Sequence, residues 1–440
     1  MTGERLFSRR EVMRICGMSL LAPPLTTIAG CGKRASQTFV EPNDAPYEGT
    51  DEQLLDEIQR ATFDFFWNEA SPSTGQVKDR ALANGNDSKK MSSIAATGFG
   101  LTSLCIGDQR EYGKRPEILE RVRKTLKFLA NDLPHEHGFF YHFIHMDTGQ
   151  RWEKCELSSI DSSLLYCGVL TARQYFADQE IKDLATKIYE RADWPWMLNG
   201  GKTFSMGWHP ESGFLDARWE HFCELMMIYL LAIGSPTHPV SPDAWNAWTR
   251  PTIKYQGIEY ISGNDPLFTH QYSQAWFDFR NKRDAYADYF ENSIKATRAH
   301  KLFCLSLRNR FPDYSDNLWG ISASDYVHGY TAWGGPPPQG PIDGSIVPCA
   351  TGGSLAFQFD DCIHVLRNIR GRYGNKAWSR YSFVDAFNPL TGWYDADVLG
   401  LDLGITMLMA ENHRTGFVWK IFMKNLEATT AMEKVGFHPA

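Results

Sequence analysis

The stretch "LSSIDSSLLYCGVL", residues 157–170, is long enough for a helix and contains no lysine or arginine. A helix that is apolar on most of its faces must be enclosed by other helices, because it has no polar face to offer to water. Five further stretches share this character, and we expect each to form an enclosed helix: 91–107, 222–234, 268–279, 350–366 and 397–410.

Charged, amphipathic segments separate these stretches and can face water on one side: 51–70, 115–132, 178–193, 281–300 and 415–437. Six enclosed helices that alternate with an outer amphipathic layer predict an all-α fold, an (α/α)6 barrel. The amphipathic pattern expected of the outer helices is weak near 241–252 and 371–381. A helical solenoid is the competing architecture, but the sequence shows no repeat of fixed period.

Two rim features are expected. Polar and aromatic residues alternate over 137–152 around the turn residues Asp147 to Gly149, which predicts a β-hairpin. In "ISASDYVHGYTAWGGPP", residues 321–337, glycines and prolines interrupt any helix, and the alternation is too imperfect for a strand. We expect this second segment to be an irregular loop at the mouth of the barrel.

The first 31 residues resemble an export signal rather than part of the fold. Arg9 and Arg10 precede a short apolar run, as in a twin-arginine signal, and the run is too short to span a bilayer. It ends in "IAGC", residues 28–31, the pattern that marks Cys31 for lipidation. We therefore expect a lipoprotein exported by the twin-arginine route to the periplasm or outer membrane, which contacts the membrane only through its lipid. A polar tether over 32–50 and a barrel domain over 51–440 would follow.

Composition narrows the possible partners. The net charge of −7 and the pI near 6.0 provide no basic surface for nucleic acid. Seven cysteines lie beyond Cys31 and form no CxxC pair, so we expect buried free thiols. The histidines of "HEH" at 135–137, with His142 and His145, match no strong metal motif and are expected to be solvated on the hairpin. We expect a monomer without cofactor or metal.

Three carboxylates stand in the first halves of enclosed helices with no cation within one turn: Asp161, Glu224 and Asp402. Burying an isolated carboxylate costs several kcal/mol, so either a binding site uses these residues or a distant arginine pairs with them. In an α/α barrel the helix starts converge on one face, where they favour negative charge. Glu153 and Glu156 precede the Asp161 helix. Glu153 is a candidate for binding substrate, although it could equally be solvated, and Asp397 could cap the last inner helix.

Paired carboxylates that flank an acetal carbon are the groups that hydrolyse glycosidic bonds. Flat aromatic side chains on loops would stack on sugar rings. The sequence offers such candidates in "SMGWHPESGF" and in the predicted mouth loop, and we expect these residues to bind substrate: Trp208, His209, Asp325, Tyr326, His328, Tyr330 and Trp333.

Several linked motifs resemble the bacterial glucoamylase-like domain that includes glycoside hydrolase family 144, the endo-β-1,2-glucanases. They are "ELSSIDSSLL" (156–165), "LLAIGSPTHPV" (230–240), the mouth loop (321–337), "DGSIVPCATGGSLAF" (343–357), "RYSFVDAFNP" (380–389) and "WYDADVLGLDLGITMLMAEN" (393–412). The resemblance covers roughly residues 52–430. It implies an (α/α)6 barrel without metal that hydrolyses β-1,2-glucan with inversion.

By motif position, the resemblance implies that Glu224 is the general acid and that Glu156 and Asp161 bind or assist the reacting sugar. Asp397 and Asp402 are both candidates for the base. The chain departs from its relatives in "EHFCE" around Glu224, where they tend to carry a tyrosine and small residues. Three rival functions stay open: an exo-acting hydrolase that releases disaccharide, a non-catalytic glycan-binding lipoprotein, and a polysaccharide lyase, which would need cations around an acidic sugar.

Overall fold

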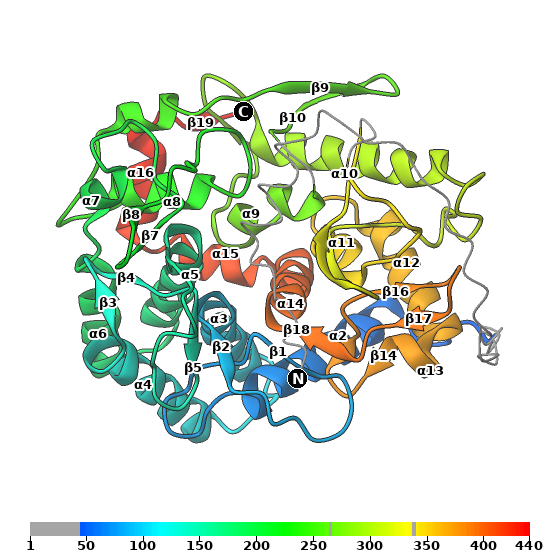
Figure 1. Cartoon of the computed structure of the whole chain (residues 1–440), viewed down its shortest axis with the longest axis horizontal. Coiled ribbons are helices and arrows are strands. Elements are labelled where there is room, and N and C mark those ends of the chain that lie inside the picture. The colour runs from blue at the N-terminus through cyan, green and yellow to red at the C-terminus, as the bar shows by residue number, and fades with distance from the viewer. Residues whose placement is uncertain (1–44, 264–265, 337–339) are drawn as a thin grey trace.

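The computed structural model describes residues 45–263, 266–336 and 340–440 (Figure 1). The predicted export signal and Cys31 lie outside the described residues, as does most of the predicted tether. Six inner helices form the ring predicted for an (α/α)6 barrel: α3 (Ile94–Gln109), α5 (Ser159–Tyr175), α8 (Met226–Gly234), α9 (Tyr272–Trp276), α11 (Pro348–Gly352) and α14 (Gly400–Thr415). Buried residues occupy nearly every position of α3, α5, α8 and α14, as enclosure requires.

The outer layer consists of amphipathic helices: α2 (Asp51–Asn68), α4 (Arg115–Asn131), α6 (Gln179–Glu190), α10 (Tyr289–Ser306), α12 (Phe359–Arg372) and α16 (Leu426–Lys434). α16 comes from the end of the chain and packs against α8 (Figure 1). The two segments with weak outer signals contain no long helix of their own: 241–252 holds the 3-10 helix η1 (Pro242–Asn246), and 371–381 holds the one-turn α13 (Gly374–Ala377) after the end of α12. α7 (Trp194–Leu198), η2 (Leu267–His270) and α15 (Phe417–Phe422) are short connecting helices.

Several predictions about single segments are wrong. The stretch 268–279 forms the short η2 and α9 rather than one helix, 415–437 divides into α15 and α16, and the helix expected over 281–300 begins only at Tyr289. The stretch 350–366 is not one helix, because α11 ends at Gly352 and the amphipathic α12 begins at Phe359. The mouth segment is not irregular throughout: β12 (Ala323–Tyr326) and β13 (Gly329–Ala332) form an antiparallel hairpin. The hairpin turns over Val327 and His328, and Gly329, which pairs with Tyr326, has a φ of 124° that favours glycine.

Short strand pairs frame the mouth of the barrel, and three of them lead directly into inner helices. β2 (Met91–Ser93) precedes α3 and pairs with β5 (Phe143–His145), and β6 (Leu157–Ser158) precedes α5. β18 (Asp397–Leu399) precedes α14 and pairs with β1 (Arg80–Leu82). The predicted 137–152 hairpin is confirmed, since the Trp152 amide donates to the Phe143 carbonyl at 3.0 Å.

The remaining strands form small hairpins and one extension of β6. These are β3 (His135–Glu136) with β4 (Phe139–Phe140), β7 (Gly207–His209) with β6 and β8 (Gly213–Phe214), β9 (Thr252–Tyr255) with β10 (Ile258–Ile261), β11 (Lys282–Arg283) with β19 (His438–Pro439), β14 (Trp378–Ser379) with β15 (Ser382–Phe383), and β16 (Phe387–Asn388) with β17 (Trp393–Tyr394).

The described end of the predicted tether packs against the barrel. Arg367 of α12 donates to the Gly49 carbonyl at 2.7 Å, and the Tyr47 hydroxyl donates to Glu57 of α2 at 2.7 Å. Within the described ranges, each helix falls short of the length or apolar character that a membrane span needs. All seven cysteines beyond Cys31 are free, and all but Cys155 are buried, as predicted.

Inner helices α3 and α5 touch backbone to backbone through Gly98 and Gly168. A Cβ added to Gly168 would lie 2.0 Å from the Gly98 carbonyl oxygen, and one added to Gly98 would lie 2.4 Å from the Leu164 carbonyl oxygen. Neither neighbour is a side chain that could rotate away. The absence of a side chain at these two positions therefore sets how closely α3 approaches α5.

We expect Gly168→Ala to lower the free energy of unfolding by about 1–3 kcal/mol or more, because overpacking forces the two helices apart. Urea unfolding at neutral pH measures the change. Gly374→Ala is the control, since its Cβ would meet only the Arg370 guanidinium at 3.2 Å. An equal loss in both variants, or no loss in Gly168→Ala, would contradict the close-contact explanation.

Candidate active site

The first group of carboxylates surrounds His142 at the start of α5, and we call His142, Glu156 and Asp161 the His142 group. Nδ1 of His142 lies 3.2 Å from Oε1 of Glu156, and its Nε2 lies 3.6 Å from Oδ1 of Asp161. All three residues are at most 5% exposed. The expectation that His142 is solvated is therefore wrong: both of its ring nitrogens face carboxylates.

Local structure holds the His142 group in place. Ser158 is the N-cap of α5: its hydroxyl oxygen accepts from the Asp161 amide at 3.3 Å, and its hydroxyl also contacts Oδ2 of Asp161. The His142 amide donates to the Glu156 carbonyl at 2.9 Å, and the imidazole stacks on Phe143 at 3.8 Å between ring centroids. Backbone and side chain together leave the imidazole little freedom to rotate.

Glu224 stands just before α8, the inner helix that packs next to α5. It is 1% exposed, and its carbonyl accepts from the Ser273 hydroxyl of α9 at 2.7 Å. The same hydroxyl oxygen accepts from the Met227 amide at 3.1 Å, which ties the beginning of α8 to α9. Burial and the adjoining Glu224 raise the pKa of the Cys223 thiol well above its usual value.

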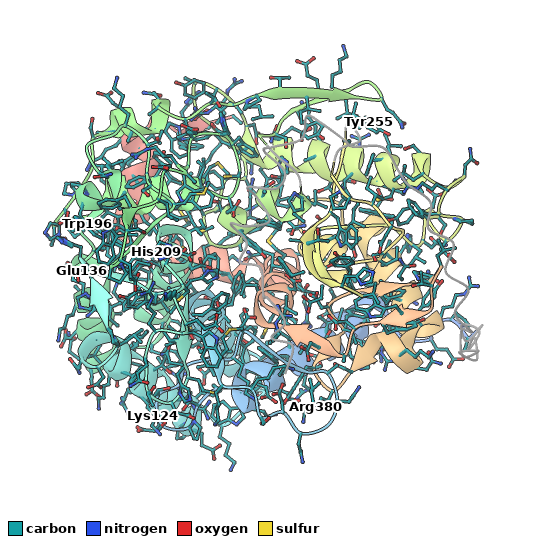
Figure 2. The ribbon with its side chains drawn as sticks, viewed as in Figure 1. Lys124, Glu136, Trp196, His209, Tyr255 and Arg380 are labelled. Carbon is teal, nitrogen blue, oxygen red and sulfur yellow. The ribbon has the colours of Figure 1, made fainter. Side chains whose placement is uncertain are left out.

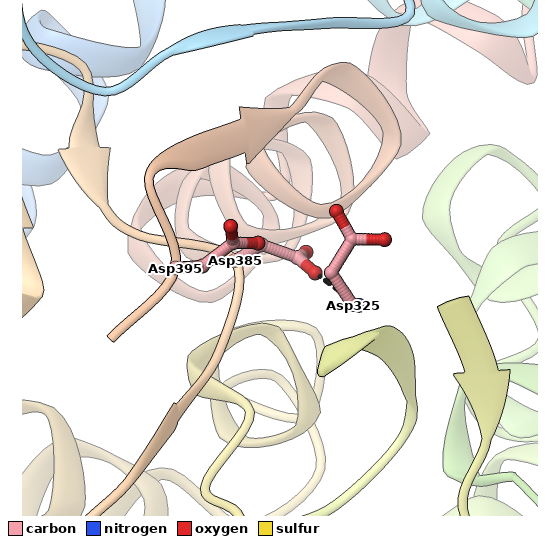
Figure 3. Close-up of side chains that lie close together, drawn as sticks. All are labelled: Asp325, Asp385 and Asp395. Atoms are coloured by element: carbon pink, nitrogen blue, oxygen red, sulfur yellow. Dashed lines mark hydrogen bonds between the residues drawn. The ribbon is translucent and has the colours of Figure 1, made fainter. Parts of the chain in front are cut away.

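The second group of carboxylates surrounds one buried arginine on β1. We call it the Arg80 cluster, and its members are Asp79, Arg80, Asp325, Asp385, Asp395 and Asp402. The guanidinium of Arg80 pairs with Asp79 at 3.1 Å and with Asp325 on β12. The Asp325 amide donates to Oδ2 of Asp385 at 2.7 Å (Figure 3). Asp385 in turn shares a hydrogen bond with Asp402 in the first turn of α14.

Burial and mutual repulsion raise the pKa of several of these carboxyls. Burial raises the pKa of Asp325 to about 6 against the opposing effect of Arg80, and burial with the nearby Asp325 raises that of Asp395 to about 7. Burial, with the charge and hydrogen bond of Asp402, raises the pKa of Asp385 well above its usual range. The Arg80 cluster therefore holds protons at neutral pH.

One cleft lies between the two groups. Its lining includes His142 with Phe143, three members of the Arg80 cluster (Asp79, Arg80 and Asp402), and Tyr330 of β13 with Leu399 and Leu401. The barrel mouth thus places an imidazole with its paired carboxylates opposite a cluster whose carboxyls are partly protonated. A group that donates a proton and one that accepts a proton can both reach a molecule bound here.

Asp325, Asp385 and Asp395 are the described residues whose oxygens converge as metal ligands could, within 4.8 Å of one another (Figure 3). Each already has a partner in the protein. Arg80 pairs with Asp325, Asp385 accepts from the Asp325 amide, and Oδ1 of Asp395 accepts from the Asp397 amide at 3.1 Å. The convergence is explained without an ion, and we assign no metal to it.

The two predicted candidates for the base have different surroundings. Asp397 pairs with Lys89 at 2.7 Å at the start of β18, away from the cap position of α14 that it could have filled. Asp402 lines the cleft. Glu153 is exposed, in a turn with φ of 47°, as the solvated alternative predicted.

Some of the predicted sugar-binding residues lie at the cleft and others do not. Tyr330 lines the cleft, and Asp325 belongs to the Arg80 cluster. Tyr326 and His328 pack edge to face near the hairpin tip, at 5.6 Å between ring centroids. The proposed stacking role of Trp333 is wrong, because its ring is 2% exposed and its Nε1 donates to Ser324 inside the hairpin at 2.9 Å.

Trp208 and His209 lie on β7, which pairs with β6. Trp208 stands opposite Leu157, one residue from Glu156 in sequence, and its ring packs on Trp196 at 5.7 Å. His209 (Figure 2) receives a hydrogen bond from Arg151 at 3.2 Å. Both residues border the His142 group from the rim of the barrel.

The sequence analysis did not identify five residues of the site: Asp79, Arg80, His142, Asp385 and Asp395. Asp385 and Asp395 stand between apolar or aromatic neighbours, within motifs that resemble the glucoamylase-like family. Such a carboxylate in an apolar context could have been recognised as a site candidate from the sequence. Arg80 and Asp325 pair across 245 positions of sequence, which no local pattern could indicate.

Comparison with known proteins bears directly on this fold and cleft. Residues 216–426 match the family model described as "Glycoamylase: Putative glucoamylase". The chain carries a glucoamylase-like domain. This match confirms the resemblance inferred from the motifs and includes most of the Arg80 cluster.

Relatives of this glucoamylase-like domain include enzymes named for β-1,2-glucans. The chain is 28% identical over 428 residues to the exo β-1,2-glucooligosaccharide sophorohydrolase of Parabacteroides distasonis, and the match covers 88% of this chain. It covers only 58% of that protein's length. The endo-β-1,2-glucanase of Chitinophaga pinensis, solved with sophorotriose and glucose, aligns with a TM-score of 0.83 and 26% identity over 89% of this chain and 99% of its own. A β-1,2-glucanase structure from P. distasonis aligns with a TM-score of 0.82 and 26% identity, over 89% of this chain and 60% of that one.

The raised pKa of Asp395 predicts how stability depends on pH. The folded state holds this proton until about pH 7, whereas the unfolded chain releases it near 3.8, so its stabilising contribution is complete below 3.8 and is lost as pH rises to 7. We expect Asp395→Asn to gain stability relative to wild type between pH 4.5 and 7.5, by roughly 1–3 kcal/mol, since one pKa unit corresponds to about 1.4 kcal/mol.

Urea unfolding at the two pH values measures this difference. Asp216→Asn at an exposed position is the control and should shift equally at both. Identical pH dependence in wild type and Asp395→Asn would contradict the assignment of a raised pKa to Asp395.

Proposed function

We propose that this glucoamylase-like domain is a glycoside hydrolase that cleaves β-1,2-glucan by general acid and base catalysis. The observation that carries the proposal is the cleft flanked by the His142 group and the Arg80 cluster. Hydrolysis of an acetal needs one carboxyl to protonate the leaving oxygen and another to activate water or to attack. The names of the relatives support β-1,2-glucan as the substrate.

Each catalytic role has one favoured residue. Glu224, by its motif position and its burial at the start of α8, is the proposed general acid. Asp402 is favoured over Asp397 as the base, because it lines the cleft while Lys89 already pairs with Asp397. Asp385 shares a hydrogen bond with Asp402, which orients the Asp402 carboxylate. We propose an inverting reaction, in which the base activates a water molecule.

The abundance of carboxylates argues against a polysaccharide lyase. Arg80 is the one arginine or lysine that lines this cleft within the described ranges, and Asp79 and Asp325 pair with it. An acidic sugar would meet the remaining negative charge of the Arg80 cluster. A neutral glucan avoids that repulsion and offers hydroxyl groups, which carboxylates can bind as hydrogen-bond acceptors.

We propose internal cleavage of the polymer rather than release of disaccharide from an end. The chain matches 99% of the length of the Chitinophaga pinensis endo-glucanase, whereas 42% of the exo-acting sophorohydrolase lies outside the match. The second candidate is exo-acting release of disaccharide, favoured by the name of that curated relative. The two differ in their early products.

We expect Glu224→Gln and Asp402→Asn to lower kcat on linear β-1,2-glucan by at least about 100-fold, because each removes a proton-transferring group. Asp397→Asn is the matched control at the neighbouring aspartate, and we expect it to retain activity within about tenfold. Reducing-sugar release at saturating substrate gives the rates. A large loss in Asp397→Asn with an active Asp402→Asn would reverse the assignment of the base.

Product size distinguishes the two modes of attack. An endo-acting enzyme should produce a ladder of oligosaccharides within the first few percent of cleavage and a fast fall in polymer length. Chromatography of early time points, with optical rotation followed in parallel, reports both mode and stereochemistry. Disaccharide as the sole early product would favour the exo-acting alternative, and inert wild-type protein that still binds the polymer would favour a glycan-binding function.

A further inference from the structure

His142 is part of the cleft wall, and neither its sequence context nor the comparisons assign it a role. It is 5% exposed and lines the cleft. Its two ring nitrogens face two different carboxylates, Glu156 at 3.2 Å and Asp161 at 3.6 Å. The carboxylate side chains are themselves 7% and 2% exposed, so water screens these contacts little.

The chemistry of imidazole limits what such an arrangement can be. A neutral imidazole has one N–H donor and one lone pair, so one of the two carboxylates would face a lone pair. The imidazolium form donates from both nitrogens and places one positive charge between two negative ones. Without that cation each carboxylate would lose a counter-charge, and burial favours the protonated form of a carboxyl.

We propose that His142 is an imidazolium positioning residue, which keeps Glu156 and Asp161 ionised and oriented beside the wall of the cleft where the sugar binds. This role rests on the proposed function only for the identity of the sugar. His142 transfers no proton to substrate, and no covalent step is assigned to it. The ring is fixed by the stack on Phe143, and its own amide is fixed by the bond to the Glu156 carbonyl.

The other charged and titratable groups of the cleft are consistent with this role. Across the cleft stand Asp79, Arg80 and Asp402, with Tyr330 on β13. Arg80 pairs with Asp79 and Asp325. Because these carboxylates compensate its positive charge, Arg80 repels the imidazolium only weakly. Asp79 and Asp402 add negative potential that favours a cationic ring.

The protonation state of His142 can be measured without any substrate. In the intact protein labelled with ¹⁵N at histidine, the ring signals lost in His142→Asn identify those of His142 among the 13 histidines. We expect both ring nitrogens to carry protons at pH 7.5. A neutral ring at that pH would overturn the proposal whatever the substrate proves to be.

The second measurement is the pH dependence of kcat/KM on linear β-1,2-glucan for wild type and His142→Asn. Without the cation, the Glu156 and Asp161 pair holds a proton to higher pH, so we expect the acid limb of the profile to rise by about one pH unit or more. Activity near pH 6 should fall at least tenfold and recover in part at higher pH. His135→Asn, at an exposed histidine of the neighbouring hairpin, should keep the wild-type profile.

The outcomes separate the two proposals. A uniform loss of activity in His142→Asn with an unshifted acid limb would mean that His142 is only structural, and would overturn the positioning role. If wild type hydrolyses no β-1,2-glucan but the ring is doubly protonated at pH 7.5, the proposed substrate fails while the imidazolium assignment is supported. Urea unfolding of each variant shows whether a loss reflects misfolding.

Discussion

The cost of burying negative charge constrains the whole mouth of this barrel. The starts of the inner helices concentrate carboxylates where little water reaches them, and each uncompensated charge there would cost several kcal/mol. The chain compensates in two ways. On the α5 side an imidazole stands between two carboxylates, and on the α14 side one guanidinium and retained protons serve a larger set. The two solutions place carboxylates paired with an imidazole and carboxyls with raised pKa values at one cleft, and acid and base chemistry needs two such different environments.

Much of the fold could be predicted from the absence of lysine and arginine in six stretches. The rule works for α5 and α14, where arginine occurs only in the last turn, at Arg173 and Arg414, beyond the apolar stretches that predicted the two helices. It fails over 350–366, where the stretch without lysine or arginine contains the end of α11 and the start of α12. Asp360 and Asp361 favour a helix start, and this local signal was available. The position of α16 beside α8 depends on distant packing that no local pattern reports.

The site was predictable where a single residue violates a local rule, and hidden where partners are distant. Asp161 and Asp402 stood out because no cation lies within a turn of them. Their actual neighbours, His142 and Asp385, come from other segments and become visible only once the strands β5, β6 and β18 are in place. Trp333 shows the opposite error: an aromatic ring on a glycine-rich segment resembled a sugar platform, yet it forms the interior of a hairpin.

The pairing of β1 with β18, and the packing of α16 on α8, also have a consequence for the order of folding. Both contacts join the early or middle part of the chain to its last segments. During synthesis the barrel therefore cannot close until α16 has left the ribosome. Until α14 is made, the cleft also lacks Asp402. Contacts of such long sequence separation form slowly, so the unfinished barrel exposes apolar inner helices, and such exposed surface is prone to aggregate.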